Sequence, residues 1–324
     1  MRGRKSPTMP GRRDAELAPR GRAWAATVAV VAAAVLLSGC TLRKLAVRQL
    51  AGALAASDST WSADDDPELV GEALPFALKT HESLLAELPE DRALLVATCR
   101  GFASYAAGWV EAEVERLEPE SYAAAQRTRA RALALHLRAR GYCLRALELR
   151  APGSAAALRE RPESALGWAA AADVELLYWT GAAWGSAIAL GLDRPELVAD
   201  LPSVRALFDR ALELAPDWDR GTVHEAMISI ESVSEILGGS AARARRHFER
   251  AVELSRGGRA GPFVTYARGV LVAQQDRGGF RAALERALAI DVDAEPADRL
   301  ANLLAQERAR RLLARADELF FEEE

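Results

Sequence analysis

The sequence has little of the material from which catalytic and metal sites are built. Among its 324 residues are 3 Cys and 4 His, and the four His do not stand at the spacing of metal ligands. Neither a nucleophile elbow, nor a phosphate-binding glycine loop, nor a paired-carboxylate signature occurs along the chain. His224 and Glu225 are adjacent on an expected helix and point in different directions, so they do not form a chelating pair. We therefore expect a protein that is not an enzyme and that needs no cofactor and no metal.

A comfortable membrane span is also lacking, although a shorter apolar run lies near the start. Residues 23–37 are 15 uncharged, mostly apolar residues behind a basic segment. This order is typical of an export signal, and the run is shorter than the ~20 residues of a membrane span. Leu37-Ser38-Gly39-Cys40 follows and has the form of a bacterial lipobox. The pattern predicts a lipoprotein signal peptide over residues 1–39 and a lipid on Cys40. The alternative is a chance Cys behind a transmembrane anchor.

Lipidation of Cys40 would decide where the protein resides. Acyl chains would hold the folded body to a membrane of the cell envelope, facing the periplasm or the outside of the cell. The residue after the lipidated Cys is Thr41. An Asp at that position would signal retention in the inner membrane, and Thr does not. The sequence therefore favours the outer membrane.

Lysine is scarce, and the body of the chain is acidic. The chain has 3 Lys against 39 Arg. Without residues 1–39, which hold 7 basic and 2 acidic residues, it keeps 35 basic and 44 acidic residues, a net charge of −9. A body of this charge has no overall attraction to nucleic acid or to an anionic bilayer. Cys99 and Cys143 remain after lipidation. One disulfide is open to them in an oxidising compartment, but their apolar helical surroundings favour two buried thiols.

The remaining pattern predicts an all-α protein of stacked antiparallel helical pairs. Ala, Leu, Arg and Glu dominate, and apolar residues recur at helical spacing with no sustained alternation. We expect a lipidated N-terminus and linker over residues 40–66, with a short helix at 41–56 and a polar stretch at 57–66. Asp66-Pro67-Glu68 suits a helix start, so the helical repeat domain is expected over residues 67–324. Residues 296–321 are expected to form a final capping helix.

Internal similarity supports a repeat. Pro67-Glu68-Leu69-Val70 returns as Pro195-Glu196-Leu197-Val198, and both copies are expected to give a short helix, a Pro and a longer helix. A tetratricopeptide repeat places a small residue, an aromatic, Ala and Pro at fixed intervals. Val204, Phe208, Ala211 and Pro216 match that pattern in full. Partial matches end at Ala146, Ala251 and Ala287.

The ordered set of segments resembles the TRAP transporter TatT-component family, where TRAP means tripartite ATP-independent periplasmic transport. The string DDDPELVGEALPFALKTHESLLAELPED over residues 64–91 resembles the opening of that family. Further stretches that resemble it lie at 173–190, 194–225, 238–255 and 297–320. His81 and Cys99 depart from what the family would lead one to expect. The resemblance implies a non-enzymatic periplasmic lipoprotein of cryptic tetratricopeptide-like helical pairs, and a homotrimer with a pore or cavity in each protomer. It also implies that the protein engages the transporter's solute-binding subunit. The alternative is a generic tetratricopeptide lipoprotein that scaffolds envelope assembly.

Five residues are candidates for a ligand site or cavity wall: Lys79, Tyr178, Trp179, Trp184 and Gln306. Tyr178, Trp179 and Trp184 cluster around Gly181 and Gly185, which would let another helix come close, and their rings suit a cavity for an apolar or carboxylate-bearing ligand. Lys79 is a rare lysine and a candidate anion contact, and Gln306 interrupts the apolar stripe of the last helix. The alternatives are ordinary core packing for the aromatic cluster, a solvated helix face for Lys79 and a buried hydrogen bond for Gln306, and the sequence favours the first and the last of these.

Overall fold

The computed structural model describes residues 49, 52 and 58–321 of the chain. The signal peptide, Cys40 and most of the short helix expected at 41–56 lie outside the described residues. The described part is all-α, as predicted, and contains no strand. Within residues 58–321, no helix is both long enough and apolar enough to cross a bilayer.

The α-helices of the described residues are α2 (Asp58–Ser62), α3 (Pro67–Glu87), α4 (Arg92–Tyr105), α5 (Glu111–Leu117), α6 (Tyr122–Arg150), α7 (Ser154–Glu160), α8 (Val174–Leu190), α9 (Pro195–Val198), α10 (Leu201–Leu214), α11 (Thr222–Glu231), α12 (Ala241–Leu254), α13 (Gly261–Tyr266), α14 (Arg277–Leu288), α15 (Arg299–Ala314) and α16 (Ala316–Leu319). Two π-helical segments continue helices, η1 (Ala106–Val110) after α4 and η5 (Ala267–Leu271) after α13. Short 3-10 turns are η2 (Ala171–Asp173), η3 (Trp218–Gly221), η4 (Glu235–Leu237) and η6 (Pro296–Asp298). The helix α2 lies in the stretch that was expected to be a linker.

Side-chain caps explain where several helices begin. An Asp or Ser before the helix accepts a hydrogen bond from a first-turn backbone N–H, which satisfies one of the donors that the helix leaves unpaired. The capping residues are Asp66 for α3, Asp91 for α4, Ser121 for α6, Ser240 for α12 and Asp276 for α14. The predicted start at Asp66-Pro67 is confirmed, because Leu69 N donates to Asp66 Oδ1 at 3.0 Å.

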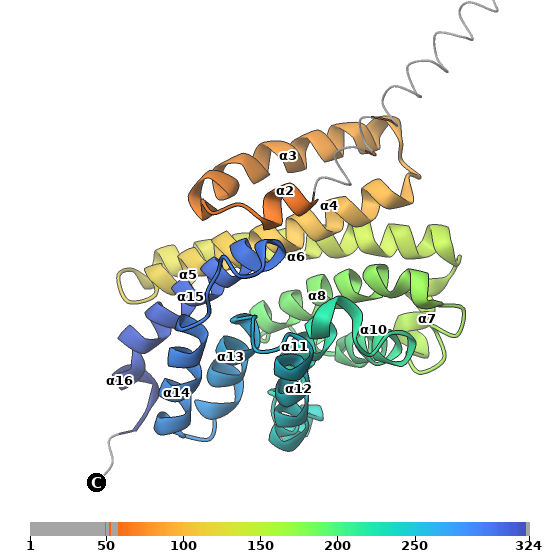
Figure 1. Cartoon of the computed structure of the whole chain (residues 1–324). Coiled ribbons are helices and arrows are strands. Elements are labelled where there is room, and N and C mark those ends of the chain that lie inside the picture. The colour runs from red at the N-terminus through yellow and green to blue at the C-terminus, as the bar shows by residue number, and fades with distance from the viewer. Residues whose placement is uncertain (1–48, 50–51, 53–57, 322–324) are drawn as a thin grey trace, which may run out of the picture. The chain divides into compact units, whose positions relative to one another are not determined.

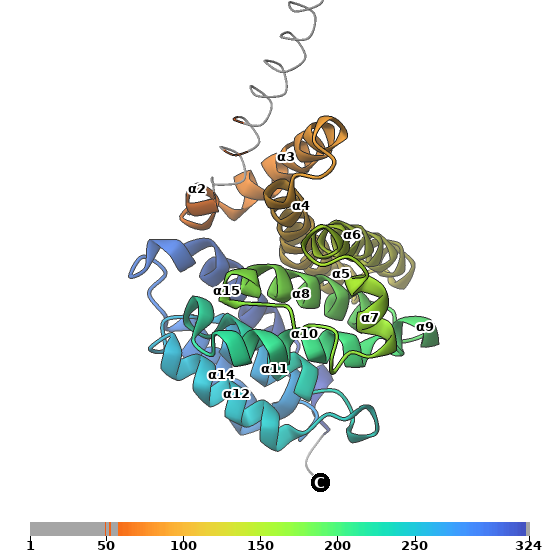
Figure 2. The same cartoon turned by 90° about the vertical axis from the view of Figure 1, so that its right-hand side faces the viewer.

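Neighbouring helices pack in antiparallel pairs along the chain. Figure 1 shows α3, α4 and α6 lying one below the other, with α8 and α10 next in the stack. Figure 2 shows α11 and α12 beside α14. The long helix α15 returns toward the beginning of the domain, where Arg299 donates to the carbonyl of Ala63 at 2.8 Å. Helices from both ends of the described chain therefore surround one interior.

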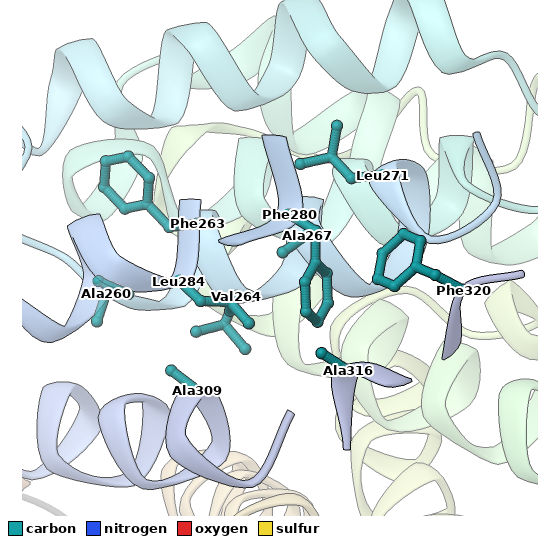
Figure 3. Close-up of a cluster of buried hydrophobic side chains, with 11 residues drawn as sticks. Ala260, Phe263, Val264, Ala267, Leu271, Phe280, Leu284, Ala309, Ala316 and Phe320 are labelled. Carbon is teal, nitrogen blue, oxygen red and sulfur yellow. The ribbon is translucent and has the colours of Figure 1, made fainter. Parts of the chain in front are cut away.

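Small residues and aromatic rings fit together between the pairs. Phe208 of α10 is 2% exposed and lies against Gly181 of α8, where a Cβ would come within 2.8 Å of the ring. A second cluster, shown in Figure 3, joins α13, α14 and the last helices, with Phe280 and Phe320 ring centroids 5.0 Å apart. The four Ala that end the expected repeat units are buried, namely Ala146, Ala211, Ala251 and Ala287.

The two similar segments that begin at Pro67 and Pro195 fold differently. The second copy breaks as expected into α9 and α10, whereas α3 runs unbroken through Pro75. Proline removes one helical hydrogen bond and crowds the residue four positions earlier, which here is Gly71. A Cβ at Gly71 would overlap the indole of Trp109, and Trp109 Nε1 donates to the carbonyl of Pro67 at 2.8 Å. This tertiary contact fixes the first turn of α3, so the expectation of a short helix before Pro75 was wrong.

The expectation of two buried thiols was also wrong. Cys99 of α4 and Cys143 of α6 form a disulfide, with their Cα atoms 5.5 Å apart. Both are fully buried, and apolar surroundings are compatible with a disulfide once two helices bring the sulfurs together. With a sequence separation of 44 between the two Cys, the cross-link is expected to stabilise the fold by about 4 kcal/mol through the unfolded chain.

Candidate functional site

A cavity of ≈ 1230 Å³ lies between the helices of the two ends of the domain. Its walls come from α2, α3, α4, η1, α8, η3, α11, α13 and α15. The apolar part of the lining includes Val70, Leu74, Leu78, Ala97, Leu300 and Leu304. Concave, mostly apolar spaces with a few polar groups are where proteins hold small molecules, so this cavity is the candidate site.

Aromatic rings make up much of the remaining wall. Tyr178 and Trp179, both predicted for a cavity, line it together with Trp218, Trp109 and Trp61. The Tyr178 ring centroid lies 4.9 Å from that of Trp179 and 5.1 Å from that of Trp218. Burial, followed by the charges of Glu225 and Asp219, raises the pKa of Tyr178, so its hydroxyl stays neutral at physiological pH. The rings are inclined to one another, by 74° for Tyr178 and Trp179 and by 44° for Tyr178 and Trp218, and they form an angled apolar wall with one neutral hydroxyl.

One group of charges in the wall is an ion-pair network on Arg259. Arg259 contacts Asp219 at 2.9 Å and Asp298 at 3.0 Å. Arg220 reaches the same Asp298. The backbone of Asp219 and Arg220 has φ of 43° and 53°, in the left-handed region that costs non-glycine residues energy. The ion pairs hold these two side chains against the wall in that conformation.

Glu225 is the least compensated carboxylate of the wall. It lies in the first turn of α11 and packs against Gly261, where a Cβ would overlap its carboxylate. Burial raises its pKa to about 7, although the charge of Arg259 and a hydrogen bond with Thr265 act in the opposite direction. A carboxyl group of this pKa exchanges a proton near neutral pH, so the cavity wall changes charge there.

His81 contributes the second isolated polar group. It lines the cavity from α3, and burial, followed by the charge of Arg100, lowers its pKa. Its Nδ1 is buried and has no hydrogen-bond partner among the described residues. Arg100 itself pairs with Glu175 of α8 at 3.1 Å. A neutral imidazole nitrogen therefore faces the interior beside an ion pair.

The structure places the other predicted site residues away from this cavity. Trp184 is fully buried, and its Nε1 donates to Asp200 at 3.1 Å. Lys79 is mostly exposed and pairs with Glu82 at 2.6 Å. Gln306 is buried, and its Nε2 donates to the carbonyls of residues 287, 288 and 290 at 3.1, 3.3 and 2.8 Å. These contacts give Trp184 and Gln306 a role in the core and Lys79 a surface ion pair. Binding of a ligand by any predicted site residue stays a prediction.

Sequence reasoning missed several groups that face the cavity. These groups are Glu225 of α11, His81 of α3, Trp218 of η3 and Arg259 of the connection between α12 and α13. No local spacing connects them, because the return of α15 and the turn η3 bring them together. Within residues 58–321, no group of three or more His, Cys, Asp or Glu is arranged to hold a metal ion.

Comparison with known proteins identifies a family for nearly the whole described domain. The family model described as TRAP transporter T-component matches residues 63–320. A relative in Treponema pallidum (strain Nichols), described as an uncharacterized protein, is 29% identical over 310 residues, which are 90% of this chain and 96% of the relative. The match therefore covers every helix that lines the cavity except α2, which ends at Ser62.

Proposed function

Because the chain belongs to the TRAP transporter T-component family, we propose that it binds the periplasmic solute-binding subunit of a TRAP transporter. We further propose that it receives the solute in its own cavity. In this role the protein catalyses no reaction. It holds the subunit near the membrane and accepts the solute that the subunit carries.

The observation that supports the second step is the cavity itself. A volume of ≈ 1230 Å³ exceeds what a small solute needs, and its wall is apolar and aromatic with ion pairs that are already satisfied. Such a wall favours organic solutes with a large apolar part, since burial stabilises by ~25 cal/mol per Å² of apolar surface. Glu225 and Tyr178 supply hydrogen bonds to a polar end of such a solute.

We propose that the protein works at the cell envelope through a lipid on Cys40, with the body in the periplasm. The disulfide between Cys99 and Cys143 supports this location, because such bonds persist in oxidising compartments and are rare in the cytosol. A Cys40→Ser variant is expected to lose the acyl groups and to leave the membrane fraction.

The test of the partner is a titration of the full chain, purified in detergent, against the solute-binding subunit of the same organism. We expect saturable association in the micromolar range, about 8 kcal/mol, as is usual for a transient interface. Light scattering on the same sample gives the oligomeric state, for which the family resemblance implies a trimer. No association at tens of micromolar between two folded proteins would contradict the transporter role and favour envelope scaffolding.

The test of the cavity is a matched pair of Ala→Phe variants. Ala301 of α15 lines the cavity and is exposed to it, whereas Ala282 of α14 is exposed and does not line it. We expect Ala301→Phe to weaken binding of an apolar fluorescent dye, read by energy transfer from the wall tryptophans, while Ala282→Phe leaves it unchanged. Equal dye binding by both variants would show that the dye, and by inference the solute, does not enter here.

A further inference from the structure

A second, smaller hollow lies beside the cavity and carries a different kind of wall. This cleft has a volume of ≈ 240 Å³ and is formed by α5, α6, η5, α15 and the residues that follow α15. Its apolar floor consists of Val114, Leu190, Val272, Leu312 and Leu319. Five arginines, Arg129, Arg268, Arg308, Arg311 and Arg315, line it together with Glu111, Glu115 and Glu118. We call it the arginine cleft.

The carboxylate of Glu115 is shared by three guanidinium groups of the cleft. Glu115 Oε1 accepts from Arg308 Nε at 2.7 Å, and Glu115 Oε2 lies 3.4 Å from Arg311. Arg268 reaches the same Glu115 only at 3.5 Å, the outer limit for such a bond. The charge of Arg308, followed by burial, lowers the pKa of Arg268, which reflects repulsion between the two guanidinium groups.

The other carboxylates near the cleft are engaged elsewhere. Glu111 lies 2.7 Å from His136 Nε2, and Glu118 pairs with Arg129 at 2.6 Å and Arg315 at 3.3 Å. On the outer side, Glu307 pairs with Arg311 at 2.6 Å and Glu318 with Arg315 at 2.8 Å. Arg268 therefore has no closer carboxylate than Glu115 among the described residues. The Nε atoms of Arg129 and Arg311 are buried without a hydrogen-bond partner there.

We propose that the arginine cleft binds a small oxyanion with two negative charges, such as a phosphate group or a short dicarboxylate, held by Arg268, Arg308 and Arg311. Planar guanidinium groups match the paired oxygens of both ligand types. The side chains of Arg308 and Arg311 are only 26% and 24% exposed beside the apolar floor, so the local dielectric there is low and strengthens their charge-assisted hydrogen bonds. In this arrangement Glu115 occupies the arginines when the cleft is empty, and the anion competes with it for them.

The cleft is coupled to the cavity by shared residues. Arg308 and Arg311 line both hollows, so an anion that draws these side chains into the cleft also changes the charge at the cavity wall. The site does not depend on the solute-binding subunit. Failure of anion binding would therefore leave the proposed partner role untouched, and failure of the partner role would leave the cleft untouched.

The test uses the full chain in detergent, titrated with inorganic phosphate and, separately, with succinate at constant ionic strength set by chloride. We expect saturable heat with at least one of them. Phosphate alone would assign a tetrahedral phosphate ligand, and succinate alone a dicarboxylate. No saturable heat with either anion would overturn the proposal.

Two substitutions make the test specific to the cleft. Arg268→Gln is expected to weaken binding about tenfold or more, since a hydrogen bond to a charged group carries at least that factor. Arg245→Gln is the control, because Arg245 is exposed on α12 and pairs with Glu249 at 2.9 Å; it should bind as the wild type does. Equal affinity in the two variants would overturn the proposal.

The Glu115→Gln variant is expected to change anion affinity in the opposite direction from Arg268→Gln. Removing the competing carboxylate should tighten anion binding severalfold and enlarge the increase in melting temperature that the anion causes. A folded Glu115→Gln protein that binds the anion more weakly would contradict the proposed competition. Should this variant not fold, the comparison of Arg268→Gln with Arg245→Gln decides.

Discussion

The two ends of helix α11 carry the same side chain in opposite surroundings. Glu225, in the first turn, faces the cavity, and burial raises its pKa to about 7. Glu231, the last residue of α11, is buried between α10 and α12. Arg205 forms an ion pair with one of its carboxylate oxygens and Arg243 with the other. Burial alone would raise the pKa of Glu231, but hydrogen bonds from Arg243 and Arg205 outweigh burial and lower it.

The comparison shows that burial alone does not decide the charge of a carboxylate. A buried carboxylate stays ionised where cations complete its hydrogen bonds, and it tends to hold a proton where an apolar wall takes their place. The end of α11 is therefore built for stability, and its beginning for a change of charge. Substitutions along this helix can separate the two roles.

The largest effect is expected at the stable end. Glu231→Gln should lower the free energy of unfolding by about 3 kcal/mol at pH 7, because it breaks a buried pair and leaves two guanidinium groups without their carboxylate. Denaturation in urea measures the change. Glu235→Gln serves as the control, since Glu235 is exposed in η4. A loss below about 1 kcal/mol for Glu231→Gln would mean that the pair contributes no more than surface pairs do.

At the cavity end of α11, Glu225 should make the free energy of unfolding depend on pH. With a pKa of about 7 in the folded chain and an ordinary value near 4.5 when unfolded, the folded state binds more protons between these values. Stability from this group is thus fully present below the unfolded pKa and is lost as pH rises through 7. Between pH 5 and pH 8 the wild type should lose about 2 kcal/mol that Glu225→Gln does not lose.

The measurement for Glu225 is a series of urea titrations across that pH range, with Glu235→Gln again as the control. Parallel curves for the wild type and Glu225→Gln would show that the carboxyl group titrates normally and is well solvated. A difference of the opposite sign would place a cation closer to Glu225 than Arg259 lies in the structure.

The smallest effect on stability is expected at the histidine pair, whose His224 directly precedes Glu225 in the first turn of α11. His224 Nδ1 of α11 lies 2.8 Å from His247 Nδ1 of α12, and burial, followed by the charge of His224, lowers the pKa of His247 to about 4. The unfolded chain then binds more protons between that value and 6.5, so stability is lost as pH falls below 6.5. His247 is only partly buried, which limits the loss to about 1 kcal/mol.

Differential scanning calorimetry at pH 7 and pH 5 measures this loss of stability. His247→Gln should abolish it. The effect of His247 on stability has the opposite direction to that of Glu225 over the same pH range. An unchanged pH dependence in His247→Gln would mean that the histidine pair does not contribute to acid sensitivity.

The helices and their starts could be predicted from the sequence because their causes are local. Asp66 and Pro67 begin α3, and Phe208 and Ala211 mark the buried face of α10, at positions that periodicity and capping chemistry identify. The family and the all-α class followed from the order of such segments. Of the three aromatic residues predicted on α8, Tyr178 and Trp179 line the cavity, whereas Trp184 is buried elsewhere and donates to Asp200.

The remaining features depend on contacts between distant parts of the chain. Pro75 does not break α3 because Trp109, far along the chain, anchors the first turn. Cys99 and Cys143 meet only because α4 and α6 pack closely. Glu225 looks like an ordinary early-helix acid in the sequence, and it differs from Glu231 only through the side chains that other helices place beside each of them.

The π-helical segment η1 joins α4 to α5, and its wide turn determines which way α5 faces. A π segment holds one residue more than an α-helical turn of the same kind. In a regular α-helix, one additional residue turns everything after it by about 100°, whereas the wide turn of η1 takes up its additional residue and keeps α5 facing α15. Deletion of one residue within α5 is not compensated in this way, and Glu115 would then leave Arg308 and the arginine cleft, although no side chain of the cleft had been changed. Gene variants that shorten η1 by one codon should therefore keep the charge pairing of the cleft, and variants that shorten α5 by one codon should lose it.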